Sequence, residues 1–164
     1  TDKFSLVFPD YRERTLRHEA GHFLLAYLHG SPIADYSLEL KGARVQLGQA
    51  VLQRKLYQGP LDDAELDSLA VIAMGGVAGE AIKYEEVIGQ TEDLFDLQSL
   101  MNKSKKKLND SEQQNLTRWA VLRAVSLLNE YQGAYERLME KMSEGASVYE
   151  CICAIESAAP NQEK

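Results

Sequence analysis

The stretch His18-Glu19-Ala20-Gly21-His22 lies inside a predicted helix and decides how the rest of the chain is interpreted. We expect this helix to begin near Asp10 and to run to about Leu28, because Gly30-Ser31-Pro32 then ends it with a glycine followed by a proline. Most other side chains near the stretch are apolar, so the helix is expected to be largely buried. Buried polar groups are costly unless they are satisfied, and a metal ion bound to both histidines would satisfy them.

The spacing of the two histidines indicates a metal site. Residues four apart on a helix lie on the same face, about one turn from each other, so both imidazoles can bind one ion from the same side. Glu19 lies between them, close enough to act on a water molecule at that ion. This is the HExxH arrangement of zinc-dependent peptidases. The motif predicts Zn²⁺ as the cofactor, His18 and His22 as its ligands, and Glu19 as the catalytic base.

A catalytic zinc site needs a third protein ligand, and no remaining histidine can supply it. His29 lies on nearly the same helix face as His22, but about 10 Å further along the axis. The metzincin pattern is excluded, because Leu25 and Leu28 stand where its glycine and third histidine would fall. The third ligand is therefore expected to be a carboxylate from another part of the chain.

Four carboxylates are candidates for this ligand, namely Glu80, Glu92, Asp93 and Asp96. Asp93 falls in the first turn of a predicted helix, where exposed backbone N–H groups and the helix dipole keep an aspartate ionised. The same position is equally explained by a simple match to the helix dipole, without any metal.

The rest of the chain is predicted to be helical apart from one β-hairpin. The hairpin strands are expected at residues 33–40 and 45–52, directly after the motif helix. Two adjacent glycines cost about 2 kcal/mol relative to alanines, so Gly75-Gly76 indicates close backbone approach to another helix, such as the motif helix. The further helices are expected at residues 61–84, 92–108 (Thr91 as N-cap, Lys103, Lys105, Lys106 and Lys107 in its last turns), from Asn109-Asp110-Ser111 to about Met142, and 148–157.

Composition and length indicate one soluble globular domain over residues 1–164. The chain is 45% apolar and 26% charged, and its net charge of −7 argues against a nucleic-acid partner. It opens on Thr1 rather than Met, which we interpret as processing or excision from a longer chain that held targeting or membrane segments. Cys151 and Cys153 are expected to pack in the core of the last helix rather than to form a disulfide.

Four segments carry a wider resemblance. They read HEAGHF at residues 18–23, GSPI at 30–33, GGVAGE at 75–80 and GQTEDL at 89–94. In this order they resemble the peptidase domain of FtsH-type membrane metalloproteases. The resemblance implies a mainly α, helical zincin-like peptidase domain with a small hairpin after the motif helix. It also implies Asp93 as the third zinc ligand, with Glu80 and Asp96 as alternative ligands or as groups that support a ligand.

The departures from this family narrow the resemblance. Val77 replaces the arginine of the family and Glu92 replaces an asparagine, and no GxxxxGK[ST] phosphate loop occurs, so the family's ATPase module is missing from this chain. In this respect the chain is similar to the stand-alone FtsH-like proteins of plants and cyanobacteria. That similarity implies a chloroplast location. The wider resemblance to the FtsH-type family implies a membrane or ATPase partner outside this chain, and a homo-oligomer.

The expected activity is that of a zinc endopeptidase that hydrolyses peptide bonds in unfolded or flexible protein segments with a metal-activated water. The polypeptide substrate is expected to lie extended beside the second strand, at Leu47, Gly48 and Gln49. A rival interpretation is a catalytically silent FtsH-like scaffold or assembly factor that retains zinc. A third is an α-helical interaction domain in which the motif occurs by chance.

Overall fold

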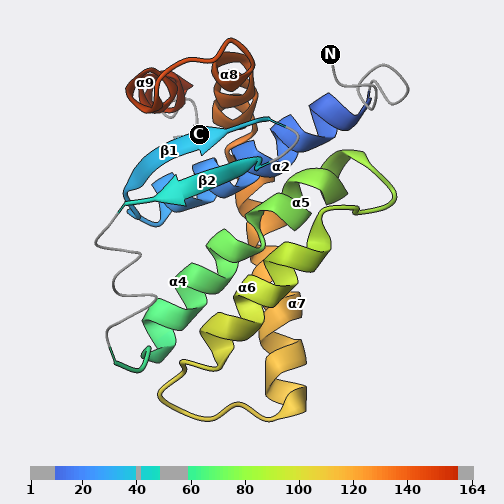
Figure 1. Ribbon diagram of the computed structural model, residues 1–164, viewed down its shortest axis with the longest axis vertical. Coiled ribbons are helices and arrows are strands. Elements are labelled where there is room, and N and C mark those ends of the chain that lie inside the picture. Colours follow the sequence, from blue (N-terminus) through green and yellow to red (C-terminus); the bar gives the residue numbers. More distant parts are fainter. Residues whose placement is uncertain (1–9, 40–41, 49–58, 159–164) are drawn as a thin grey trace.

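The computed structural model describes residues 10–39, 42–48 and 59–158 of the chain. Within these ranges the protein is mainly helical, with one two-stranded antiparallel sheet (Figure 1). The elements follow in the order α2 (Asp10–Leu28), β1 (Ile33–Ser37), β2 (Arg44–Leu47), α4 (Asp63–Ala73), α5 (Gly75–Lys83), α6 (Gln90–Met101), α7 (Asp110–Glu130), α8 (Gln132–Ser143) and α9 (Val148–Ala158). The prediction of a mainly helical fold with a small hairpin after the motif helix is confirmed. None of the helices in the described ranges is both long and apolar enough to span a membrane.

Helix α2 is the centre of the fold. It contacts α4, α5, α7, α8 and both strands, so that most of its faces are covered (Figure 1). Its apolar residues at 20 and 23–26 are fully buried, as the apolar segment around the motif predicts. The metal-binding stretch therefore lies on a helix that is held on several sides, which limits how far its side chains can move.

The hairpin is shorter than predicted over the described residues. Strand β1 pairs with β2 in an antiparallel register that places Tyr36 opposite Val45, and the register shifts between Ile33 and Asp35. The predicted strand residues 40 and 49–52 lie outside the described residues. The aromatic ring of Tyr36 packs edge-on against Phe23 of α2, which attaches the hairpin to the central helix.

The segment predicted as one helix over residues 61–84 is two helices, so this prediction is wrong. Helix α4 begins after a capping box between Asp62 and Glu65 and ends at Ala73, with Met74 as its C-cap directly before the glycine pair. A Cβ added to Gly75 would lie 2.8 Å from the carbonyl oxygen of Gly21 on α2, and a Cβ on Gly21 would overlap the carbonyl of Gly75. The predicted close approach of the glycine pair to the motif helix is confirmed. The break at Met74 allows α5 to pack along α2.

Helix α6 differs from the prediction at both ends. Its N-cap is Gly89 rather than Thr91. Asp93 nevertheless lies in the first turn, as predicted. The helix ends at Met101, because Lys103 and Lys105 form backbone hydrogen bonds with Leu61 at the start of the α4 region. The lysine cluster at 103–107 therefore follows the helix instead of occupying its last turns.

The predicted helix at 109–142 is also divided, into α7 and α8, with the break at Tyr131. The predicted start is confirmed by a capping box between Asn109 and Glu112. After the break, α8 packs against α2, and the hydroxyl of Tyr135 donates to the carbonyl of Arg17 at 2.6 Å. Trp119 of α7 is 43% exposed.

The prediction that the two cysteines of α9 form no disulfide is confirmed, but the prediction that both pack in the core is wrong for Cys153. Both cysteines are free, as expected from their spacing. Cys151 is fully buried, whereas Cys153 is exposed, because residues two apart on a helix point in roughly opposite directions.

Candidate metal centre

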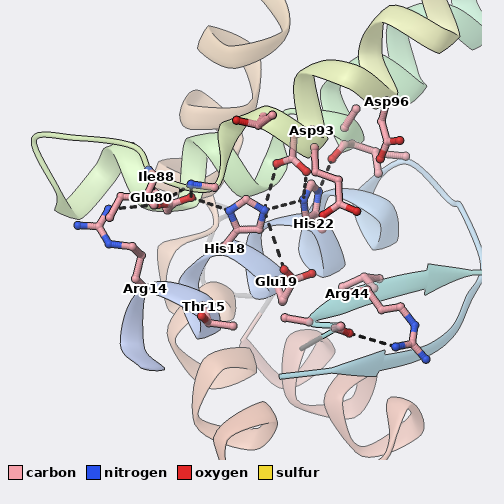
Figure 2. A pocket seen from close by; sticks show the side chains of 18 of the residues that line it. Arg14, Thr15, His18, Glu19, His22, Arg44, Glu80, Ile88, Asp93 and Asp96 are labelled. Atoms are coloured by element: carbon pink, nitrogen blue, oxygen red, sulfur yellow. Dashed lines mark hydrogen bonds and ion pairs between the residues drawn. The ribbon is translucent and has the colours of Figure 1, made fainter. Parts of the chain in front are cut away.

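Helices α2 and α6 bring together the three predicted ligands His18, His22 and Asp93 (Figure 2). One ligand atom from each residue lies within 4.8 Å of the others, so the group could hold a metal ion. The two Nε2 atoms are 3.2 Å apart. The carboxylate of Asp93 faces both rings, with Oδ2 3.1 Å from Nε2 of His18 and Oδ1 3.2 Å from Nε2 of His22.

The opposite edges of the two imidazole rings are held by hydrogen-bond acceptors. Nδ1 of His18 lies 2.7 Å from a carboxylate oxygen of Glu80, and Nδ1 of His22 lies 2.8 Å from the carbonyl oxygen of Ile72. Because both partners can only accept, each Nδ1 carries the proton and donates. In the neutral rings the Nε2 lone pairs therefore face each other and the Asp93 carboxylate.

This arrangement fits a bound cation. Two lone pairs and an anionic carboxylate that converge on one point repel each other unless a positive charge lies between them. Oδ2 of Asp93 is buried and finds no hydrogen-bond donor of suitable geometry among the described residues. An unsatisfied buried carboxylate oxygen is costly in an apolar surrounding, and a metal ion would satisfy it.

The pKa shifts of the ligands in the metal-free protein have the same origin. Burial lowers the pKa of His18, but the carboxylates of Asp93 and Glu80 outweigh burial and raise this pKa to about 10. Burial likewise opposes the charged form of His22, yet its pKa is raised by Asp93. Burial raises the pKa of Asp93, but the two histidines outweigh it and lower the value to about 2. These shifts all favour a positive charge between the rings and the carboxylate.

Glu19 lies beside this group, from the turn of α2 that separates the two histidines. Its side chain is only 6% exposed, and Oε2 lies 3.9 Å from Nε2 of His18 (Figure 2). Burial raises the pKa of Glu19, and the charges of the two histidines oppose this shift. A carboxylate with a raised pKa next to a ligand group is suited to accept and release a proton.

Glu80 is placed behind His18 and not among the ligand atoms. Its side chain is 1% exposed and receives hydrogen bonds from the Nδ1 of His18, from Arg14 and from the backbone N–H groups of Ile88 and Gly89. These donors outweigh the effect of burial and lower the pKa of Glu80. Of the two roles the resemblance implies for Glu80, the geometry fits support of a ligand.

Sequence reasoning missed Arg14, which stabilises Glu80 from the opposite side. Its Nη1 lies 3.1 Å from Oε1 of Glu80 and donates to the carbonyl of Glu86 at 2.7 Å, and its guanidinium lies 4.0 Å above the ring of Tyr84. The only sequence signal was its position four residues before His18, on the same helix face.

The ligand group opens into a cavity of about 590 Å³ between α2, α4, α6 and the hairpin. Glu92, Asp96 and Leu47 line this cavity, but neither of the two acidic residues belongs to the ligand group. The N–H of Gly48 donates to the carbonyl of Pro32, and the predicted substrate contact Gln49 lies outside the described residues. His29, directly after the end of α2, donates to the carbonyl of Leu25, away from the ligand group, as expected.

Comparison of the chain with protein-family models, with curated proteins and with solved structures gave no match.

Proposed function

We propose that this protein is a zinc-dependent endopeptidase with a zincin-like, FtsH-like fold. The convergence of His18, His22 and Asp93 beside the buried carboxylate of Glu19 is the observation that carries the proposal. Two imidazole nitrogens and one carboxylate are a common ligand set of catalytic zinc, which leaves a fourth position for water or substrate. Divalent zinc also suits a mixture of nitrogen and oxygen ligands in a four-coordinate site.

Each residue of the group then has a defined role. The Nε2 atoms of His18 and His22 and the carboxylate of Asp93 hold the ion, and Glu80 keeps the ring of His18 in the orientation that binds it. When bound, zinc supplies a Lewis acid that polarises the scissile carbonyl and lowers the pKa of the attacking water. Glu19 accepts a proton from this water and later donates it to the leaving amine.

The substrate in this proposal is a polypeptide in extended conformation. Strand β2 contributes Arg44, Val45 and Leu47 to the cavity wall, so a peptide beside this strand would lie next to the ligand group. A peptide can add to a sheet edge as a further strand only if the backbone of the peptide is free of other hydrogen bonds. Unfolded or flexible segments meet this requirement, and stably folded ones do not.

The test combines metal analysis with a cleavage assay. Purified protein is analysed for zinc, and cleavage of an unfolded casein-type substrate is then followed with and without a chelator. We expect about one zinc per chain and chelator-sensitive cleavage. Glu19→Gln should retain zinc and lose cleavage, whereas Glu85→Gln, which removes the same charge from an exposed residue outside the cavity wall, should keep both.

The alternative outcomes separate the rival functions. Zinc without cleavage in the wild type would favour the silent scaffold or assembly factor. Absence of zinc would favour an α-helical interaction domain in which the motif occurs by chance. Equal cleavage by the wild type and by Glu19→Gln would overturn the proposed mechanism.

A further inference from the structure

The cavity beside the ligand group has an acidic row along α6 that the proposed mechanism does not use. Glu92, Asp96 and Leu100 succeed one another at intervals of four residues, so they share one face of the helix, and all three line the cavity. Asp93, in the first turn of α6, lines the same cavity. Figure 2 shows Asp96 next to Asp93. The row therefore extends from the ligand group into the cavity.

The two carboxylates of this row have no ion-pair or hydrogen-bond partner among the residues that the structure describes. Two arginines line the same cavity, but neither is paired with the row. Arg14 binds Glu80, and Arg44 donates to the carbonyl of Gly42. Asp96 is half-buried, so its charge is less well solvated than that of a surface aspartate.

The neighbouring wall of the cavity is apolar. Helix α4 contributes Leu69 and Ala73, which are half-buried and four residues apart, together with the buried Ile72. The buried Leu100 of α6 adjoins this wall. A carboxylate next to apolar groups interacts more strongly with an opposite charge than it would in water.

We propose that this cavity selects polypeptide segments that carry a lysine or arginine, whose side chain lies along the row with its charged end at Asp96. The proposal rests on the proposed function, since it assumes a polypeptide ligand. The aliphatic stem of a lysine or arginine covers the partly exposed Leu69 and Ala73, while its cationic end pairs with the carboxylate. A purely aliphatic side chain would cover the same wall but would leave Asp96 desolvated and unpaired.

The experiment measures binding and not cleavage. Zinc-loaded Glu19→Gln protein is titrated with fluorescent peptides that differ only in one central residue, which is lysine, arginine, norleucine or glutamate. We expect the lysine and arginine peptides to bind roughly three- to tenfold more tightly than the norleucine peptide, and the glutamate peptide to bind most weakly. High salt should reduce the differences, because the pairs are only partly buried.

Variants of the row locate the effect. Added to the same protein, Asp96→Asn should remove most of the preference, and Asp96→Lys should shift it toward glutamate. Asp67→Asn is the matched control, since it removes the same charge from an exposed residue of α4 outside the cavity wall. Thermal unfolding and zinc content verify that each variant is folded, and Glu92→Gln replaces Asp96→Asn if the latter is not.

The outcomes distinguish this proposal from the proposed function. Equal binding of the lysine and norleucine peptides, absence of peptide binding, or equal effects of Asp96→Asn and Asp67→Asn would overturn the basic-residue preference. A clear lysine preference together with a wild type that cleaves none of the peptides would support the preference and contradict the peptidase.

Discussion

Nδ1 of His18 donates to Oε2 of Glu80 across 2.7 Å, and this contact links a metal ligand to the loop that leads to Asp93. The same carboxylate receives the N–H groups of Ile88 and Gly89, directly before α6 begins. One buried side chain thus fixes the orientation of His18 and the backbone that places the third ligand.

The first prediction concerns this carboxylate. Glu80→Gln retains the shape of the Glu80 side chain but removes its negative charge. The glutamine should orient the ring of His18 less firmly, and Nε2 of His18 should become a weaker donor to zinc. We expect zinc affinity to fall roughly 10- to 100-fold, measured by competition with a chromophoric chelator. Glu85→Gln removes the same charge from an exposed residue of the following loop and should leave the affinity unchanged. Equal affinities for the two variants would contradict the supporting role of Glu80.

The second prediction concerns Arg14, which holds both Glu80 and the carbonyl of Glu86. A lysine carries the charge but not the planar fork of donors, so Arg14→Lys should hold the loop less firmly. We expect faster amide hydrogen exchange over residues 86–89 in this variant. Arg12→Lys, at an exposed position of the same helix, is the control and should exchange like the wild type. Unchanged exchange in Arg14→Lys would show that the loop does not depend on this arginine.

The third prediction tests the close approach of α2 and α5. Gly21→Ala places a methyl group against the carbonyl of Gly75, and the backbones must move apart to admit it. We expect the free energy of unfolding to fall by at least about 2 kcal/mol, measured by denaturant titration. In Gly133→Ala the new methyl group meets no atom within 4 Å, and the variant should be slightly more stable than the wild type. A loss of similar size in both variants would contradict the packing argument.

The fourth prediction concerns the start of α7. The side chain of Asn109 accepts from the N–H of Glu112 at 2.9 Å, so Asn109→Ala leaves that group without its cap. We expect a loss of about 1 kcal/mol in the free energy of unfolding. Zinc affinity should not change, because the cap has no contact with the ligand group. Asn115→Ala, at an exposed position within α7, is the control and should not destabilise the protein, since alanine favours helix.

The helix breaks show which parts of the fold could not be predicted from sequence. Neither Met74 nor Tyr131 is a helix-breaking residue type, so local patterns continue the helix through both. What decides the breaks is packing, because α5 follows α2 through the Gly21–Gly75 contact and α8 reaches Arg17 through Tyr135. The Gly75-Gly76 pair indicates the first of these contacts but not the helix break beside it, and no local pattern indicates the contact of Tyr135 with Arg17. The capping box at Asn109 is local, and its position was predictable.

The residues of the metal centre were likewise only partly predictable from the sequence. His18 and His22 follow from helix geometry alone, because both lie on one helix. Asp93 is 71 residues from His22, and physical reasoning left it among four carboxylates until the FtsH resemblance singled it out. Arg14 and Glu80 are 66 residues apart, and no motif connects them. Supporting contacts of this kind become visible only when the fold brings distant segments together.

The fifth prediction separates a bound metal from a simple network of histidine and carboxylate. His22→Ala removes one of three ligands and should reduce zinc binding to near the background level, measured by elemental analysis after dialysis. His29→Ala is the matched control, because His29 directly follows α2 and its ring bonds the carbonyl of Leu25, away from the ligand group. It should bind as much zinc as the wild type. A chelator should lower the melting temperature of the wild type and of His29→Ala, since loss of a ligand that binds only the folded state removes stability. It should leave the melting temperature of His22→Ala unchanged. A chelator effect of equal size in all three proteins would place the metal elsewhere in the chain.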